Sequence, residues 1–264
     1  MSAARRSTIG VIGGSGIANL LGEKVRLSHR VSTPWGAPSA PIEEGEVGGV
    51  RVLFLSRHGP GHSIPPHRVN YRANVDALHT LGADAIVTAS SVGSLREELA
   101  PGTFVLPNQF VDFTKQRPTT FFDGGKVYHV SLADPFCPEL LSAASDVGRD
   151  IGSPFAEGKT YVCVEGPRFS TRAESKYFRT FADVIGMTLV PEVTLARERA
   201  MCYACLAMVT DYDVWAERPV QASEIVEVMH RNADRMGQVL ARVIPRLAGE
   251  KNCRCAHALD DAGI

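Results

Sequence analysis

The sequence predicts an α/β fold in a single domain over residues 1–264, with residues 247–264 at its periphery. Short apolar runs that suit buried strands alternate with amphipathic segments that suit helices. The 264 residues are 44% apolar, which is enough to bury a substantial core. No internal repeat, low-complexity block or long linker divides the chain. We therefore expect a mixed, twisted central sheet flanked by helices.

Strands are expected where an apolar run of strand length is bounded by turn residues. These runs cover residues 8–12, 50–55, 85–89, 103–111, 160–164, 184–188 and 203–210. Helices are expected where apolar residues recur at helical spacing, over residues 71–81, 138–151, 172–181, 190–199 and 223–246. Residues 114–128 mix aromatic and polar side chains without periodicity, which predicts a long functional loop.

The charge balance argues against a nucleic-acid or membrane-surface partner. Lys and Arg total 28 against 29 Asp and Glu, so there is no net field to attract an anionic polymer or lipid surface. No apolar run reaches the length of about 18 residues that a membrane-spanning helix needs. The first apolar run is broken by glycines from Gly10 onward, unlike a signal peptide. We expect a soluble cytoplasmic enzyme.

The cysteines are too few and too scattered for a secreted disulfide scaffold; they are Cys137, Cys163, Cys202, Cys205, Cys253 and Cys255. Residues 202–205 form CxxC inside an apolar run, which favours a buried strand. Residues 253–255 form CxC near the C-terminus. Zinc prefers four ligands at recognisable spacing, and neither a second CxxC nor a His pair is present, so we predict no metal site. The sequence leaves open which of these cysteines form disulfides.

Glycines follow the first expected strand, as Gly10-Val-Ile-Gly13-Gly14-Ser15-Gly16. Glycines let backbone N–H groups approach an anion, and Ser15 adds a hydroxyl. The GxGxxG spacing of dinucleotide sites is not met, and the lysine of a triphosphate loop is missing. A small-anion site and a simple tight turn both remain open.

Two further strand ends carry anion-binding side chains. Arg57 and His58 follow the run 50–55, and Ser90, Ser91 and Gly93 follow the run 85–89. Arginine offers a planar fork to an oxyanion, and histidine can add a donor. Because ligands collect at the carboxyl ends of strands in α/β sheets, these groups predict one shared site. A solvated surface loop is the alternative for the Arg–His pair.

An acidic pair, Asp211 and Asp213, ends the last expected strand, so both side chains should start on one face. Neighbouring carboxyls in a partly dry site repel, and one then keeps its proton to higher pH. Such a pair can protonate a leaving nitrogen and accept a bond from an exocyclic amine. A metal-binding or solvated pair has the same spacing. Phe169 suits either stacking on a flat base or the core, and Glu192 at a helix start is expected to be structural.

These stretches, in this order, resemble the purine nucleoside phosphorylases, in particular their methylthioadenosine branch. The resemblance rests on IGVIGGSGI, RHGPGHSIPPHRVNYRAN, GSLREELAPG, ADPFCP, EGPRFSTRAES, MTLVPEVTLARE and TDYDVW, and it covers nearly the whole chain. It implies a three-layer phosphorylase fold, a homo-oligomer (a trimer or a dimer of trimers), and inorganic phosphate as co-substrate with no cofactor.

The resemblance also implies roles for individual residues. Phosphate would be bound by Ser15, Arg57, His58, Ser90 and Thr188. The nucleoside would be framed by Phe169, Ser170, Met187, Thr210 and the backbone around Ser91 and Gly93, with the base held by Asp211 and Asp213. An alkylthio pocket would draw on Ala222, Ile225 and Val226, and His129 would reach the neighbouring subunit's site.

Within this family, the TDYD motif favours adenine over 6-oxopurines. Gly186 and Ala222 are smaller than the family's usual residues, which predicts that adenosine is also accepted. The alternatives are a broader purine nucleoside phosphorylase acting on adenosine, inosine or guanosine, a hydrolytic nucleosidase, and a non-catalytic nucleoside-binding protein. The tail CxC resembles that of archaeal thermophilic relatives that carry disulfides within each subunit.

Overall fold

The computed structural model describes residues 5–14, 21, 25–216 and 222–263, with the backbone alone for most of 222–233. Its centre is a nine-stranded mixed sheet in the order β10-β7-β8-β9-β6-β2-β5-β4-β3. The strands are β2 Thr8–Gly13, β3 Leu27–His29, β4 Ile42–Val47, β5 Val50–Ser56, β6 Ala85–Ser94, β7 Phe104–Phe113, β8 Phe155–Val164, β9 Val184–Gly186 and β10 Cys202–Asp211.

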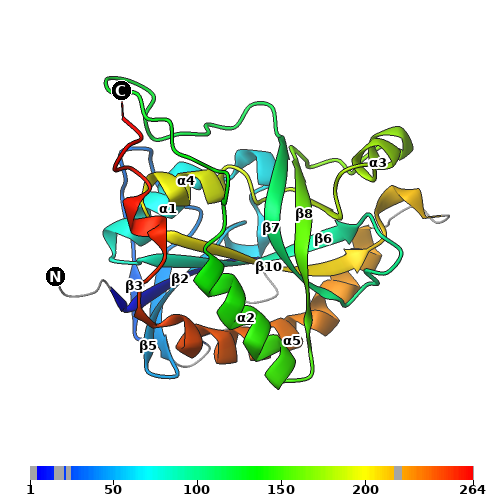
Figure 1. The fold of residues 1–264 in the computed structure, drawn as a ribbon, viewed down its shortest axis with the longest axis horizontal. Coiled ribbons are helices and arrows are strands. Elements are labelled where there is room, and N and C mark those ends of the chain that lie inside the picture. The colour runs from blue at the N-terminus through cyan, green and yellow to red at the C-terminus, as the bar shows by residue number, and fades with distance from the viewer. Residues whose placement is uncertain (1–4, 15–20, 22–24, 217–221, 264) are drawn as a thin grey trace.

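The sheet closes on itself at one end. β10 pairs with β7 and also runs parallel to β6, so β6, β10, β7, β8 and β9 form a barrel-like ring. β2 pairs parallel to β6 and to β5 and continues the sheet outward. In Figure 1, β6 and β10 lie across the molecule while β7 and β8 cross them steeply. The parallel strands β2, β5, β6 and β10 therefore direct their carboxyl ends to one region.

Helices cover both faces of the sheet, which confirms the expected three-layer fold. α1 (Tyr71–Thr80) and α4 (Glu192–Glu198) lie on one face, and α2 (Pro138–Asp150) and α5 (Ala222–Leu247) lie on the other (Figure 1). Alternate strand residues enter alternate cores, as Val11 faces the α2–α5 side and Ile12 the α1–α4 side. Burial on both faces explains why the strands are continuously apolar.

A third, smaller core holds α3 (Arg172–Phe178) beside the ring. The Thr171 side chain accepts a bond from the Glu174 N–H, and the Glu174 carboxylate accepts one from the Thr171 N–H. This capping box satisfies two donors at the helix start. Thr171 is thus the N-cap of α3.

Several predicted boundaries were wrong, for physical reasons. The strand expected at 85–89 runs on to Ser94, because pairing with β10 continues through small and polar residues. The run 184–188 stops at Gly186, so Thr188 lies in a turn. β4 was not predicted because its sequence IEEGEV is mostly polar, and pairing with β5 and β3 supplies the stabilisation that burial does not.

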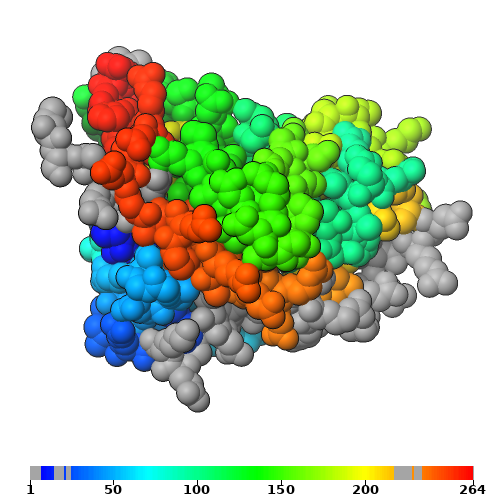
Figure 2. All heavy atoms as spheres, turned by 60° about the horizontal axis from the view of Figure 1, so that its bottom comes forward, coloured from blue at the N-terminus to red at the C-terminus, as the bar shows by residue number. Residues whose placement is uncertain are grey.

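The C-terminal segment lies against the body of the molecule. Gly249–Glu250 (β11) pairs with Arg5–Arg6 (β1), and Cys255 at 4% exposure belongs to the α2–α5 core. In Figure 2 this orange-to-red segment runs along the surface beside green α2. Among the described helices, none is both long and apolar enough to cross a bilayer.

Candidate active site

A cavity of about 570 Å³ lies where the carboxyl ends of β5, β6 and β10 meet the β8–α3 connection. Twelve of the residues predicted from the sequence line it: Arg57, His58, Ser90, Ser91, Gly93, Phe169, Ser170, Met187, Thr188, Thr210, Asp211 and Asp213. The basic loop after β5 and the acidic pair after β10 therefore share one cavity. This is the arrangement expected from the strand ends.

A change of strand partner along β6 creates the floor of the cavity. One edge of β6 pairs with β2 up to Thr88 and with β9 from Gly93, while β10 occupies the other edge. Between these two partners, residues 89–92 have no strand neighbour on that edge within the described part of the chain. Their backbone groups thus face the cavity rather than a strand, which suits binding of a polar ligand.

Arg57 is held rigidly at this floor although it is only 2% exposed. Its Nε donates to Glu192 Oε2 at 2.9 Å and its Nη2 to Glu192 Oε1 at 3.1 Å. Nη2 also donates to the Thr88 hydroxyl, and Nη1 lies 3.4 Å from the Ala89 carbonyl oxygen. Burial opposes the charge, but the Glu192 carboxylate outweighs it and raises the pKa of Arg57. A fixed cation is thereby available at the cavity wall.

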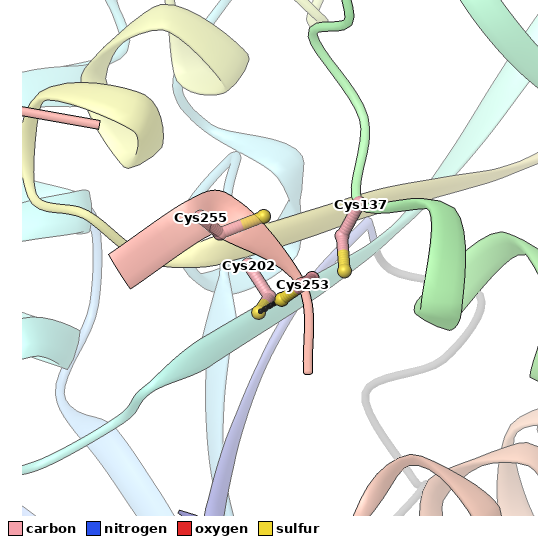
Figure 3. Close-up of side chains that lie close together, drawn as sticks. All are labelled: Cys137, Cys202, Cys253 and Cys255. Carbon is pink, nitrogen blue, oxygen red and sulfur yellow. Dashed lines mark hydrogen bonds between the residues drawn. The ribbon is translucent and has the colours of Figure 1, made fainter. Parts of the chain in front are cut away.

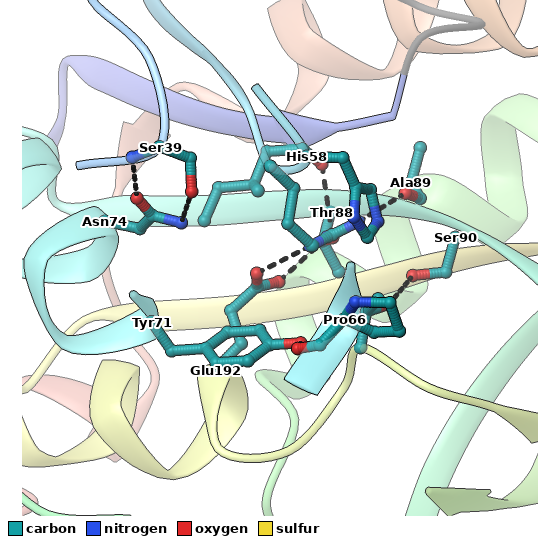
Figure 4. Close-up of polar contacts among 12 residues, drawn as sticks. Ser39, His58, Pro66, Tyr71, Asn74, Thr88, Ala89, Ser90 and Glu192 are labelled. Atoms are coloured by element: carbon teal, nitrogen blue, oxygen red, sulfur yellow. Dashed lines mark hydrogen bonds and ion pairs between the residues drawn. The ribbon is translucent and has the colours of Figure 1, made fainter. Parts of the chain in front are cut away.

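Glu192 positions Arg57 from behind and does not line the cavity. The carboxylate is fully buried at the start of α4 (Figure 4). Tyr203 Oη donates to it at 2.9 Å. This agrees with the structural role expected from the sequence. The ion pair itself could not be predicted, because Arg57 and Glu192 are 135 residues apart.

His58 differs from the sequence prediction in its hydrogen-bonding role. Its Nδ1 lies 2.8 Å from the Ile64 carbonyl, which can only accept, so Nδ1 carries the proton. Burial, followed by the Arg57 charge, lowers the pKa of His58 to about 4. At neutral pH the ring is therefore uncharged and Nε2 bears a lone pair. We expected His58 to donate to an anion, whereas this tautomer makes Nε2 an acceptor.

Two hydroxyl groups complete the polar side of the cavity. Ser90 Oγ on β6 lies 3.3 Å from Thr188 Oγ1 in the turn after β9. The two side chains come together because β9 ends at Gly186, just beyond its pairing with Gly93. Each hydroxyl can donate to a ligand oxygen. With Arg57, they form a cluster of donors at one end of the cavity.

The acidic pair converges by a route other than strand periodicity. Asp211 ends β10 after a register shift, and Asp213 begins a short 3-10 turn with φ of 51°. The sequence argument assumed that the two side chains share one face of a strand. They do not, because Asp213 lies beyond the end of β10. The Asp213 N–H donates to Asp211 Oδ2 at 2.9 Å, and Trp215 Nε1 fixes the turn by donating to the Ser94 carbonyl at 2.7 Å.

The two carboxyls are not equivalent. Asp211 Oδ1 accepts from the Thr210 hydroxyl at 2.7 Å, so both Asp211 oxygens already have donors. Asp213 is 5% exposed, and its Oδ2 has no hydrogen-bond partner among the described residues. Burial raises the pKa of both carboxyls, and in Asp211 the bonds from Thr210 and the Asp213 N–H oppose this rise. The protonated forms consequently persist to higher pH than in a solvated carboxyl.

These raised pKa values have a defined effect on stability. The native state binds protons at this site more tightly than the unfolded chain, so ionising the pair weakens folding as pH rises through the raised values. The sign is opposite for Glu44, where a hydrogen bond from Arg51 lowers the pKa to about 2. Acidic side chains whose burial costs stability are typical of a ligand-binding site.

Apolar side chains form the rest of the wall. Phe169 is 40% exposed and lines the cavity, so it is not a core residue. Met187 lies beside it in the lining, and Met208 of β10 and Met236 of α5 were not predicted. Both had been interpreted only as parts of apolar patterns, and nothing in their spacing distinguished a cavity wall from a core. Methionine side chains adapt to irregular apolar ligands.

Gly186 is required by close packing. A Cβ at this position would lie 1.9 Å from Tyr161 Oη, so no larger residue fits while Tyr161 occupies that space. Tyr161 is fully buried. The small residue noted in the sequence therefore does not enlarge the cavity at this point, because the tyrosine ring fills the volume behind it.

Four predicted residues have no described side chain, and a fifth lies in another part of the structure. Ser15 lies outside the described residues, and so do the side chains of Ala222, Ile225 and Val226 in α5. His129 lies in a second, smaller hollow together with Arg254 and His257. It had been predicted to reach a neighbouring subunit, which a single chain does not test.

Comparison with known proteins identifies the family. Residues 8–245 match the model of the phosphorylase superfamily. The chain belongs to the phosphorylase superfamily. An S-methyl-5'-thioadenosine phosphorylase of Pyrococcus horikoshii is 55% identical over 251 residues, covering 95% of this chain and 97% of that protein. One from Saccharolobus solfataricus is 48% identical over 264 residues, covering 97% of each.

Solved structures agree with this assignment. A methylthioadenosine phosphorylase from an antarctic soil metagenomic library superposes with a TM-score of 0.89 at 43% identity, covering 97% of this phosphorylase and 92% of that chain. A methylthioadenosine phosphorylase from Schistosoma mansoni in complex with adenine gives a TM-score of 0.86 at 37% identity, covering 90% and 91%. The fold is therefore that of this superfamily.

Replacing Glu192 by Gln should weaken folding and, through the phosphate-binding role that the family resemblance implies for Arg57, phosphate binding as well. The Arg57 charge would stay buried without its counter-ion, which costs about 3–5 kcal/mol of unfolding free energy. The freed guanidinium would no longer be fixed, so KM for phosphate should rise more than kcat falls. Denaturant unfolding and steady-state kinetics measure the two effects.

Glu198→Gln is the matched control for this change. Glu198 is a buried carboxylate of the same helix that accepts from Thr120 and Phe121 and makes no contact with Arg57. It should lower stability and leave KM for phosphate unchanged. If the two variants shifted KM for phosphate equally, the positioning role of Glu192 would be refuted.

Proposed function

We propose that this phosphorylase splits S-methyl-5'-thioadenosine with inorganic phosphate, giving adenine and 5-methylthioribose 1-phosphate. The observation that carries the proposal is the shared cavity, which is lined by a fixed arginine and by two carboxyls, Asp211 half-buried and Asp213 buried. The relatives described above, at 48–55% identity over nearly the whole chain, are named for this reaction. No resident cofactor is needed, because phosphate is itself a substrate.

Phosphate would bind at the donor cluster. Arg57 supplies a fixed positive charge, and Ser90 and Thr188 supply hydroxyl donors 3.3 Å apart. Ser15 is proposed as a fourth contributor from the glycine-rich turn. Because the guanidinium is already oriented by Glu192, little side-chain entropy is lost when the anion arrives.

His58 would accept a hydrogen bond from the P–OH group of hydrogen phosphate. Its neutral ring presents Nε2 as an acceptor, because Nδ1 is committed to the Ile64 carbonyl. A hydrogen bond from the P–OH group to Nε2 leaves the unprotonated phosphate oxygens for Arg57, the hydroxyls and the sugar. His58 thus selects the orientation in which a bare oxygen faces C1′.

The purine would lie at the acidic end. Asp211 and Asp213 can give a proton to N7 and accept from the 6-amino group, and Phe169 offers an exposed ring face for stacking. The 6-oxo oxygen of inosine or guanosine is a hydrogen-bond acceptor and would face carboxylate oxygens that also accept. This mismatch disfavours inosine and guanosine. Ser170, Thr210 and the backbone around Ser91 and Gly93 would frame the ribose and base.

The chemistry balances without any further reactant. The C1′–N9 bond breaks with its electron pair going to the base, and a phosphate oxygen bonds to C1′ through an oxocarbenium-like transition state. The aspartic acid protonates N7, so the base leaves neutral. Hydrogen phosphate contributes the compensating proton, because its ester leaves as the dianion. The negative phosphate stabilises the developing sugar cation.

Several finer features belong to the same proposal. The alkylthio group would contact the apolar wall that includes Met187, Met208 and Met236, together with Ala222, Ile225 and Val226 of α5. Ordinary adenosine would be a poorer substrate that is still accepted. The enzyme would act in the cytoplasm as a homotrimer or a dimer of trimers, with His129 contributed to the adjacent subunit's site.

A phosphate-dependence assay tests the reaction class. Adenine release from methylthioadenosine should require phosphate and be matched by an equal amount of sugar phosphate. Inosine should react far more slowly, because it lacks the amino group. Adenine release at the same rate without phosphate would identify a hydrolase and exclude the proposed mechanism.

Substituting the acids tests the base end. Asp211→Asn and Asp213→Asn should each lower turnover of methylthioadenosine by about 10²–10⁴-fold, the usual contribution of general acid catalysis, with little change in KM for phosphate. Asp150→Asn is the control, since that side chain is 61% exposed on α2 and should leave both constants unchanged. Equal losses in turnover and phosphate binding would contradict the assignment.

The pH profile of kcat/KM should follow the raised pKa values. The reaction needs a protonated acid, and burial keeps that proton bound above the usual range of an aspartate. The rate should therefore fall as pH rises through the raised pKa. A nucleoside methylated at N7 releases a neutral base without protonation, so its profile should lack this limb. The same alkaline limb with both substrates would show that another group controls the rate.

A further inference from the structure

Four of the six cysteines meet at one point of the structure, well apart from the catalytic cavity. We refer to them as the thiol cluster; they are Cys137, Cys202, Cys253 and Cys255. All four Sγ atoms lie within 4.8 Å of one another, and those of Cys202 and Cys253 are 3.4 Å apart. Figure 3 shows the four side chains close together, with a dashed line between the sulfur atoms of Cys202 and Cys253. None of the four residues lines the cavity.

The cluster is assembled from three separate segments. Cys137 is the N-cap of α2, Cys202 is the first residue of β10, and the other two flank the start of the turn Arg254–His257. The argument from sequence spacing looked for ligands paired along the chain, so it could not find this group. Cys253 and Cys255 come from one CxC. Cys137 and Cys202 are distant in sequence and are brought beside them by folding.

The spacing of the sulfurs matches tetrahedral metal coordination. Four thiolates at about 2.3 Å from Zn²⁺ stand about 3.8 Å from one another. The observed upper limit of 4.8 Å and the contact of 3.4 Å lie on either side of that value. A disulfide requires about 2.05 Å between its sulfurs. The cluster is thus close to the geometry of a four-sulfur site without any rearrangement of the backbone.

The surroundings suit a closed structural site. Cys137 and Cys202 are fully buried and Cys255 is 4% exposed, so three ligands are shielded from water. Cys137 caps α2, and the positive end of that 13-residue helix stabilises thiolate charge. Lys251 and Arg254 lie in the same short segment as Cys253 and Cys255 and give that segment two positive charges.

We propose that the thiol cluster binds one zinc ion that fastens the C-terminal segment to the sheet and to α2. Thiolate-only tetrahedral sites favour zinc over harder ions. The segment is also anchored by the pairing of β11 with β1 and by the bond from the Asn252 N–H to Glu139 Oε1 at 2.9 Å. Beyond the cluster, the Ala262 carbonyl accepts from the His129 N–H at 2.7 Å. The zinc would thereby also hold the loop that carries His129.

The remaining cysteines provide an internal control. Cys163 and Cys205 are fully buried but lie outside the cluster. Cys205 belongs to the same strand as Cys202, three residues further along. A serine at Cys205 therefore removes a buried thiol of β10 without touching the proposed metal ligands.

The test is metal analysis of the full-length enzyme produced with zinc and purified under reducing conditions. About one zinc ion per chain is expected, and an organomercurial should release it in step with thiol modification. Cys137→Ser and Cys255→Ser should lose most of the metal, whereas Cys205→Ser should retain it. Because a ligand variant could fail to fold, cobalt substitution of the unaltered enzyme is the second measurement. It should give thiolate-to-cobalt charge-transfer bands and tetrahedral d–d bands.

Four results would overturn the proposal. The reduced, zinc-supplied enzyme could contain no stoichiometric zinc and give no thiolate–cobalt spectrum. The non-reduced protein could have a mass and peptide map showing the four cysteines joined as two disulfides, with only Cys163 and Cys205 titrating as thiols. Iron at the same stoichiometry would refute the choice of ion. Retention of zinc in both ligand variants would place the metal elsewhere.

Discussion

The site of this phosphorylase depends on one constraint: β6 must exchange β2 for β9 as its neighbour before it ends. Closing five strands into a ring pulls the second half of β6 away from the open sheet. Residues 89–92 are left without a strand partner on that edge in the described structure, and the cavity occupies this gap. The same strand stays paired with β10 on its other edge, so the gap is rigid. The cavity is therefore created by the closure of the sheet and not by the conformation of a loop.

That rigidity explains how a charged side chain is kept at the floor. A buried guanidinium costs several kcal/mol of desolvation unless its partner is fixed. Glu192 is fixed because α4 packs on the sheet and Tyr203 of β10 donates to the carboxylate. The Arg57–Glu192 ion pair therefore contributes little net stability to the fold. Its main effect is to orient the Arg57 guanidinium. At the acidic pair, Asp213 Oδ2 has no hydrogen-bond partner among the described residues, which is the pattern expected where a ligand supplies the missing partner.

Much of the fold and the site could be predicted from the sequence, and the limits have physical causes. Strands buried on both faces are continuously apolar, so β2, β5 and β10 were found nearly to the residue. Polar strands such as β4 depend on pairing, which no local pattern reveals. Arg57 and Asp211 were found because they follow apolar strands, whereas Met236 and Glu192 take their roles from contacts distant in sequence. The tautomer of His58 depended on one backbone carbonyl, which only the fold supplies.

β10 links the two polar centres of the molecule and also separates them. Its first residue, Cys202, belongs to the thiol cluster, and its last, Asp211, belongs to the cavity. Between them the strand is fully buried and is paired with β6 residue by residue. Asp211 is thus positioned by its pairing with β6 and by the short turn that follows it. The contacts of Cys202 in the thiol cluster do not position it. Fastening of the C-terminal segment and alignment of the acids are therefore independent supports, although they share a strand.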